Sequence, residues 1–259
     1  MPARYISITD FETVGQVAAM LGVLTLADHE VPQKTLLGVG VMMSYKTLYG
    51  LPTKWADVFP PAKRLGEIFQ PFNGVLNTLH YADYKEVDTP RALEVATAWA
   101  GPHMHALQFD MVWPSTDTLR EYRERHPEIE VILQVSTSAL DQVDNKMSKL
   151  LVRLARYGDS IDYVLLDKSM GRGLGMDAKE LLPLARAIAN TFPHLGLVVA
   201  GGLGPDTMHL VQPLIEEFPD ISLDAQSKLR DSGNALDRIN WDRAGNYLRS
   251  AIALTTKNS

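Results

Sequence analysis

The chain alternates short apolar runs with longer helical patterns along almost its whole length, and this alternation constrains the fold more than any other feature. Each apolar run has the length of a β-strand, and each following segment repeats its apolar residues at the spacing of a helix. The runs that we expect to form strands are residues 4–9, 35–43, 74–81, 105–112, 130–136, 162–167, 196–202 and 221–227.

Several of these runs, such as VILQV at 131–135 and YVLLD at 163–167, are apolar at nearly every position, which is typical of strands buried on both faces. Strands that alternate with helices pair in parallel through right-handed crossovers. Eight such units in about 250 residues predict a (β/α)8 TIM barrel. A doubly wound open sheet is the alternative, but the sequence after the first run, SITDFET at 7–13, lacks the glycine-rich fingerprint of that fold.

The whole chain, residues 1–259, is expected to form a single barrel domain. No linker, low-complexity tract or change of composition divides it, and its hydrophobic content of 46% is enough for one large core.

Composition excludes several classes of function. The net charge is -6 and the basic residues form no stripe, so we expect no nucleic-acid partner. The chain has no cysteine, which excludes disulfides, thiolate nucleophiles and cysteine-bound zinc. No apolar run approaches the ~20 residues of a membrane span, and residues 1–14 lack the apolar core of a signal peptide. We therefore expect a cytoplasmic protein with no membrane partner and no cofactor; nothing in the sequence predicts its oligomeric state.

Barrels of this class carry their chemistry at the carboxyl ends of the strands. This rule selects a short set of polar, basic and glycine residues as candidates for the site. They are Ser7, Thr9, Met43, Ser44, Tyr45, Lys46, His80, Asp83, Asp110, Gln134, Ser136, Thr137, Asp167, Lys168, Gly201, Gly202, Gln226, Ser227 and Lys228.

The loops after the seventh and eighth runs predict a phosphate site. Their sequences are AGGLGPDT at 200–207 and DAQSKLRD at 224–231. Glycines let backbone N–H groups approach an anion closely, and a helix expected to start near Pro205 would point its N-terminus at the same place. A tight turn that uses glycine only for its backbone angles is the alternative. The expected phosphate-binding residues are Gly201, Gly202, Gly204, Gln226, Ser227 and Lys228, and the expected partner is a phosphorylated small molecule.

The stretch YVLLDKSMGRGLGMD, residues 163–177, ends a buried strand in an acid and follows it with a glycine-rich loop. A partly desolvated carboxyl at a barrel mouth can have a raised pKa and donate a proton. Asp167 is therefore a candidate acid, although it could also serve only as a helix cap or an ion-pair partner. The loop residues expected to fold over a substrate are Gly171, Arg172, Gly173 and Gly175.

The carboxyl-terminal third resembles phosphoribosylanthranilate isomerase, a barrel family of tryptophan synthesis. The resemblance is carried by YVLLDKSMGRGLGMD, LVVAGGLGPDT and LDAQSKLRDSGNALDRINWDRAGNYL, with weaker matches at RYISIT and ALQFD. It implies an Amadori rearrangement of a phosphoribosylamine, with a strand-six aspartate as general acid and a strand-one cysteine as general base. The acid corresponds to Asp167 and the cysteine position to Ser7.

The chain departs from that family at three places. A serine hydroxyl without a partner base is a far poorer proton acceptor than a thiol, so the role of the cysteine does not carry over directly to Ser7. Asp110 stands where the family has a histidine. The loop after the second strand, MMSYKTLYGLPTKW at 42–55, lacks the family's arginine pattern, and its Tyr45 and Lys46 should shape the pocket for a different group. Its aromatic residues could stack on a planar group or simply cover the barrel.

Two hypotheses follow. The first is an isomerase-like enzyme or related lyase with Asp167 as acid and a base among Ser7, Asp110 and His80. The second is a phosphate-binding or regulatory barrel that has lost its base.

Metal and Schiff-base chemistry are less favoured. His80, Asp110 and Asp167 could hold a divalent ion, but no strand carries a His–x–Asp pair, so we expect no metal site. The motif HMH at 103–105 precedes its strand and should lie at the opposite end of the barrel.

Lys168 or Lys228 could form a Schiff base, as in aldolase barrels. Strand alternation turns Lys168 away from the acid before it, and Lys228 beside a phosphate is more simply an anion ligand.

Overall fold

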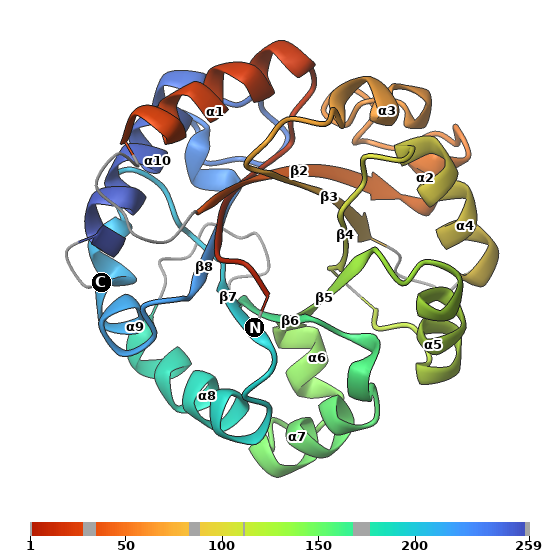
Figure 1. Ribbon diagram of the computed structural model, residues 1–259, viewed down its shortest axis with the longest axis vertical. Helices are drawn as coiled ribbons and strands as arrows, with labels where there is room; N and C mark the ends of the chain where they lie inside the picture. The colour runs from red at the N-terminus through yellow and green to blue at the C-terminus, as the bar shows by residue number, and fades with distance from the viewer. Residues whose placement is uncertain (1, 28–34, 83–88, 111, 168–176, 257–259) are drawn as a thin grey trace.

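A computed structural model shows eight parallel strands closed into a barrel in the order β1 to β8, with helices around it (Figure 1). The structure describes residues 2–27, 35–82, 89–110, 112–167 and 177–256. The predicted (β/α)8 barrel is confirmed. The strands are β1 Tyr5–Thr9, β2 Leu36–Ser44, β3 Val75–Ala82, β4 Ala106–Phe109, β5 Glu130–Ser136, β6 Tyr163–Asp167, β7 Gly196–Val199 and β8 Ser222–Ala225.

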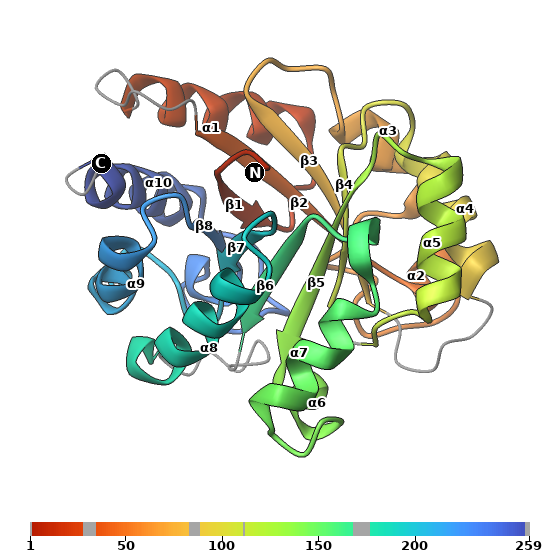
Figure 2. The ribbon, with the colours of Figure 1, turned by 60° about the horizontal axis from the view of Figure 1, so that its bottom comes forward.

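The helices form an outer layer that packs against the strands (Figure 2). They are α1 Val14–Ala27, α2 Tyr45–Leu48, α3 Leu65–Ile68, α4 Thr89–Ala100, α5 Thr116–Arg125, α6 Thr137–Asp141, α7 Met147–Ala155, α8 Ala178–Thr191, α9 Gln212–Glu217 and α10 Trp241–Thr256. Short 3-10 helices lie at η1 Ala62–Arg64, η2 Gly158–Ser160, η3 Met208–Leu210 and η4 Ser227–Leu229. None of the helices within the described ranges has both the length and the apolar character of a membrane span.

Strands β4, β7 and β8 end sooner than the sequence predicts, because the chain leaves the ladder where the rim loops begin. After β7, Ala200 still donates to the carbonyl of Leu166, but Gly201 and Gly202 then adopt positive φ angles of 94° and 75°. Backbone of this kind turns the chain away from the barrel wall and favours glycine.

The barrel interior changes from apolar to polar along its axis. The amino-terminal half is filled by a cluster of inward side chains that includes Tyr5, Leu76, Ala106, Ile132, Tyr163 and Val198. The next inward positions towards the carboxyl ends are mostly polar, as with Ser7, Gln108 and Asp224. Successive residues of a strand point to opposite faces, so these polar residues share the interior with the core below them.

Two glycines of β2 make room for the polar layer. A Cβ on Gly38 would lie 2.5 Å from Cβ of Ser7, and a Cβ on Gly40 would lie 2.8 Å from both His80 Nε2 and Thr9 Oγ1. The wall at β2 therefore lies directly against the side chains of the neighbouring strands.

The substitution Gly38→Ala should lower the free energy of unfolding by about 1–3 kcal/mol, because the added methyl group overpacks a rigid strand. The matched control is Gly22→Ala in α1, where a Cβ meets nothing within 4 Å. That change should leave stability equal or raise it by up to about 1 kcal/mol. Urea unfolding of the two variants checks this; equal effects would contradict it.

Candidate active site at the carboxyl end of the barrel

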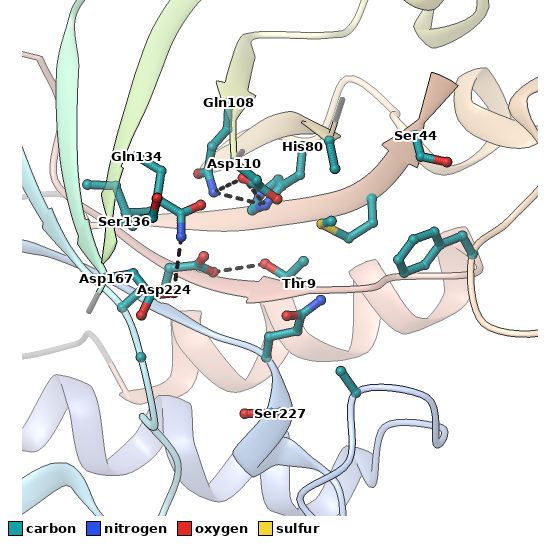
Figure 3. Close-up of a pocket in the computed structure, with 18 of the residues that line it drawn as sticks. Thr9, Ser44, His80, Gln108, Asp110, Gln134, Ser136, Asp167, Asp224 and Ser227 are labelled. Atoms are coloured by element: carbon teal, nitrogen blue, oxygen red, sulfur yellow. Dashed lines mark hydrogen bonds and ion pairs between the residues drawn. The ribbon is translucent and has the colours of Figure 1, made fainter. Parts of the chain in front are cut away.

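A cavity of about 320 Å³ opens at the carboxyl ends of the strands (Figure 3). Every strand, or the loop directly after it, contributes to its wall. The polar and glycine residues that line it are Thr9, Ser44, His80, Gln108, Asp110, Gln134, Ser136, Asp167, Gly201, Gly202, Asp224, Gln226 and Ser227.

Most of the predicted phosphate residues lie on this cavity together with the predicted acid. Gly201, Gly202, Gln226 and Ser227 line it, as does Asp167. The loops after β7 and β8 thus face one space, and the carboxyl group at the end of β6 faces the same space.

Gly204 and Lys228 lie elsewhere. They line a second hollow of about 180 Å³. A Cβ on Gly204 would lie 2.7 Å from Cβ of Lys228 and 3.0 Å from its carbonyl oxygen. These two residues therefore pack the β7 and β8 loops against each other, and they do not face the main cavity.

The prediction of a helix that starts near Pro205 is wrong. Residues 205–207 form a turn, followed by η3 and then α9. Thr207 closes this turn: its amide donates to the carbonyl of Gly204 at 3.1 Å, and its hydroxyl donates to the carbonyl of Gly202 at 2.7 Å. A loop anion would therefore depend on the amides of the turn rather than on a helix N-terminus.

Ser7 lies one inward position below the cavity and does not line it. Its hydroxyl is hydrogen-bonded to Asp224, the residue beside it on β8. Asp224 does line the cavity, and the sequence analysis did not select it. The available signal was its parity with Gln226, two residues further along the predicted run 221–227.

The predicted substrate loops are only partly placed on the cavity. Tyr45 and Lys46 belong to α2 and do not line it; Tyr45 packs on Tyr49 with ring centroids 4.7 Å apart. Trp55 and Phe59, further along the same segment, line it as a stacked pair 4.9 Å apart. The predicted residues Asp83, Lys168, Gly171, Arg172, Gly173 and Gly175 lie outside the described residues.

Two serines of the wall also start helices. Ser44 accepts the amide of Thr47 at 3.1 Å and caps α2, and Ser136 accepts the amide of Ala139 at 3.3 Å and caps α6. Serine at this position satisfies a helix amide that has no partner within the helix. The caps fix both side chains at the rim of the cavity.

Asp110, Gln108 and His80 form one hydrogen-bonded group (Figure 3). Gln108 Nε2 donates to Asp110 Oδ1 at 2.8 Å and lies 3.1 Å from His80 Nδ1. Burial raises the pKa of Asp110 to about 8, and the negative charges of Asp224, Asp167 and Asp10 act in the same direction. Burial lowers the pKa of His80 to about 4. At neutral pH, Asp110 therefore holds a proton and His80 is uncharged.

The other two carboxyl groups accept hydrogen bonds from neighbouring strands. Gln134 Nε2 donates to Asp167 Oδ2 at 3.1 Å, and the hydroxyl of Thr9 donates to Asp224 Oδ1 at 2.9 Å. Burial raises the pKa of Asp224, although the bonds from Thr9 and Ser7 oppose the shift.

A buried ion pair holds the β8 loop against the end of β1. Arg230, only 1% exposed, donates to Asp10, to the carbonyl of Gln226 at 2.6 Å and to that of Asp237 at 2.7 Å. Gln226 Nε2 also donates to Asp10 at 3.0 Å. Asp10 has a φ of 88°, in the left-handed region that costs free energy for a residue with a side chain. Neither Asp10 nor Arg230 was selected from the sequence, because nothing marks them until the two loops meet.

Among the described residues, no group of three or more histidine, aspartate or glutamate side chains is arranged to hold a metal ion. His80, Asp110 and Asp167, the possible metal ligands that the sequence made less favoured, line one cavity but do not converge on a common point in this way.

Comparison with known proteins supports the fold and no more. No family model matches the chain, and no curated protein matches it. Among solved structures, N-(5'-phosphoribosyl)anthranilate isomerase from Pyrococcus furiosus is similar, with a TM-score of 0.56 and 15% identity over 96% of this chain and 98% of that one. Octameric ribulose-1,5-bisphosphate carboxylase/oxygenase from Pyrococcus horikoshii is also similar, with a TM-score of 0.57 and 14% identity. The match covers 99% of this chain but only 60% of the carboxylase chain.

An endo-β1,6-glucanase matches with a TM-score of 0.54 and 11% identity over 99% of this chain and 76% of that one. At such identities the matches define a class of protein, the (β/α)8 barrels. The isomerase that the motifs resemble is among the particular proteins that share the fold, as are two proteins of quite different kinds.

Asp110→Asn should stabilise the protein at pH 8.5 and have little effect at pH 4. The folded protein holds a proton on Asp110 up to pH of about 8, whereas the unfolded chain releases it near the usual value of 3.8. The stability that this group contributes is therefore lost as the pH rises between those values. The gain at pH 8.5 should be on the order of 2–5 kcal/mol, since each pKa unit is worth ~1.4 kcal/mol. Urea unfolding at the two pH values checks this; an equal effect at both would contradict it.

Arg230→Met should lower the free energy of unfolding by about 3–5 kcal/mol, because it leaves the Asp10 carboxyl group buried without its cation. Adding Asp10→Asn should recover part of that loss. The matched control is Arg243→Met, whose partner Asp206 is 73% exposed; such a surface pair contributes about 0–1 kcal/mol. Equal losses in the two arginine variants would contradict the stabilising role of the buried Arg230–Asp10 ion pair.

Proposed function

We propose that this protein is an isomerase-like barrel enzyme, related to phosphoribosylanthranilate isomerase, that moves protons on a small phosphorylated molecule. One observation carries the proposal: the loops after β7 and β8 and the carboxyl groups of Asp110 and Asp167 open onto one cavity of about 320 Å³. A cavity of this size suits one small ligand.

The phosphate would lie between the loops after β7 and β8. Gly201 and Gly202 belong to a turn with positive φ angles, and both line the cavity without a side chain of their own. Ser227 adds a hydroxyl from the opposite loop. Backbone amides in such a turn, together with a hydroxyl, are suitable donors to phosphate oxygens.

Asp110 and Asp167 would divide the proton transfer between them. From the sequence, Asp167 is the expected acid and Asp110 is one of the possible bases. The raised pKa of Asp110 favours the reverse, because at neutral pH it has a proton to donate. Asp167, which accepts a hydrogen bond from Gln134, is then the proton acceptor. One group gives a proton and the other takes one, so the reaction is an isomerisation that needs no further reactant.

A ligand-binding barrel without catalysis is the second candidate, and the position of Ser7 favours it. The residue that corresponds to the base of the resembled family lies below the cavity, with its hydroxyl engaged by Asp224. Under this alternative the phosphate site binds a ligand, and no turnover follows.

The phosphate site predicts that ribose 5-phosphate raises the melting temperature and that ribose at the same concentration does not. Ser227→Ala should weaken binding of the phosphate ester about tenfold or more, since a hydrogen bond to a charged group is worth about 1.5–3 kcal/mol. Ser232→Ala, which alters the second hollow only, is the control. Equal shifts with ribose and its phosphate would contradict the phosphate site.

Turnover should fall about tenfold for each pH unit above pH 8, as Asp110 loses the proton that it donates. Asp110→Asn should abolish turnover and keep phosphate binding. The assay is conversion of phosphoribosylanthranilate, supported by growth of a tryptophan auxotroph that lacks the isomerase. Binding of phosphate esters without conversion at any pH would favour the ligand-binding alternative.

A further inference from the structure

We propose that the ligand of this cavity carries a protonated amine, and that Asp224 binds it. The substrate class is then a phosphorylated amine, such as an amino-sugar phosphate. The inference rests on the proposed function for its phosphate end, and it gives a role to a buried carboxyl group that the acid–base pair does not use.

The charge of the cavity wall is the first argument. Among the described residues that line it, three are aspartates, and none is lysine or arginine. Asp110 is protonated at neutral pH because burial raises its pKa to about 8, which leaves Asp167 and Asp224 as the acids of the wall. His80 is uncharged at neutral pH because burial lowers its pKa. The nearby buried cation, Arg230, does not line the cavity and is engaged by Asp10 and two carbonyls.

The cost of this arrangement is the second argument. A buried carboxylate is expensive unless a positive group accompanies it. Asp224 is 7% exposed, and it receives hydrogen bonds from the uncharged hydroxyls of Thr9 and Ser7. These bonds favour the ionised form but bring no positive charge. An ammonium group brings the missing charge and donates three hydrogen bonds without needing an acceptor of its own.

The position of Asp224 relative to the phosphate loops is the third argument. Gln226 is the next inward residue after Asp224 along the same segment, and Ser227 follows it. Asp224 lies within β8, whereas Ser227 begins η4 beyond the end of that strand, and both line the cavity. A ligand with its phosphate at Gly202 and Ser227 therefore places a group from the far side of its ring near Asp224 and Thr9.

Two other occupants fit the wall less well. A divalent cation needs several ligands that converge, and no such group occurs among the described residues. A ligand with a second anion near Asp224 would bring like charges together, because Asp167 and Asp224 both line this wall.

The test compares D-glucosamine 6-phosphate with D-glucose 6-phosphate, which differ only in an amine or a hydroxyl at one carbon. Titration calorimetry at pH 6.5, where the amine is protonated, should show the amino phosphate binding about tenfold or more tightly. Asp224→Asn should remove this preference and leave the affinity for D-glucose 6-phosphate within about threefold. The matched control, Asp206→Asn, changes an aspartate outside the cavity wall and should keep the preference.

A second pair, 2-aminoethyl phosphate and 2-hydroxyethyl phosphate, repeats the comparison without a sugar ring. Equal or tighter binding of the hydroxyl compounds would overturn the inference and leave the phosphate site intact. Unphosphorylated glucosamine that binds as tightly as its phosphate would instead overturn the proposed phosphate site. The inference would also be overturned if neither amino phosphate binds at millimolar concentration. It would likewise be overturned if Mg²⁺ stabilises the protein as much as an amino phosphate does and Asp224→Asn removes that stabilisation. The wild-type comparison decides the question even if the Asn variant does not fold.

Discussion

Closure of eight parallel strands is the constraint on which the rest of this structure depends. A closed barrel sends every second side chain of each strand into one shared interior, so residues far apart in the sequence become neighbours by parity alone. The lower interior is filled by apolar side chains such as Tyr163 and Ile132. The upper interior collects Gln108, Asp167 and Asp224. The glycines of β2 leave the space that Ser7, Thr9 and His80 occupy in the same layer. Core and candidate site are therefore two levels of the same packing arrangement.

The candidate site combines carboxyl groups that have different surroundings. Burial keeps Asp110 protonated, helped by the charges of three further acids, and the histidine nearby is neutral. Asp10 is paired with an arginine, and it ties the loop after β8 to the end of β1. Separate environments of this kind allow carboxyl groups of one region to differ in charge at the same pH.

Much of the barrel was predictable from the sequence, because apolar runs and helical periodicity are local properties. The carboxyl-end rule then placed Asp110, Asp167, Gly202 and Ser227 on one cavity, since it needs only the ends of the strands. Asp224 was missed because it lies inside a short strand rather than at its end. The contact between Asp10 and Arg230 joins residues that are 220 positions apart, and no local pattern reports such a contact. The expected helix at Pro205 failed because hydrogen bonds from Thr207 stabilise a turn there.

The close contact between Gly204 and Lys228 has a mechanical consequence. The glycine backbone lies so near the lysine main chain that even a methyl group would not fit between them. Neither turn can shift towards the other, and a displacement of one is passed directly to its neighbour. The two turns should respond as one stiff unit. A ligand of unusual shape must then be accommodated elsewhere on the rim, as by the segment after β2, where the rings of Trp55 and Phe59 stack.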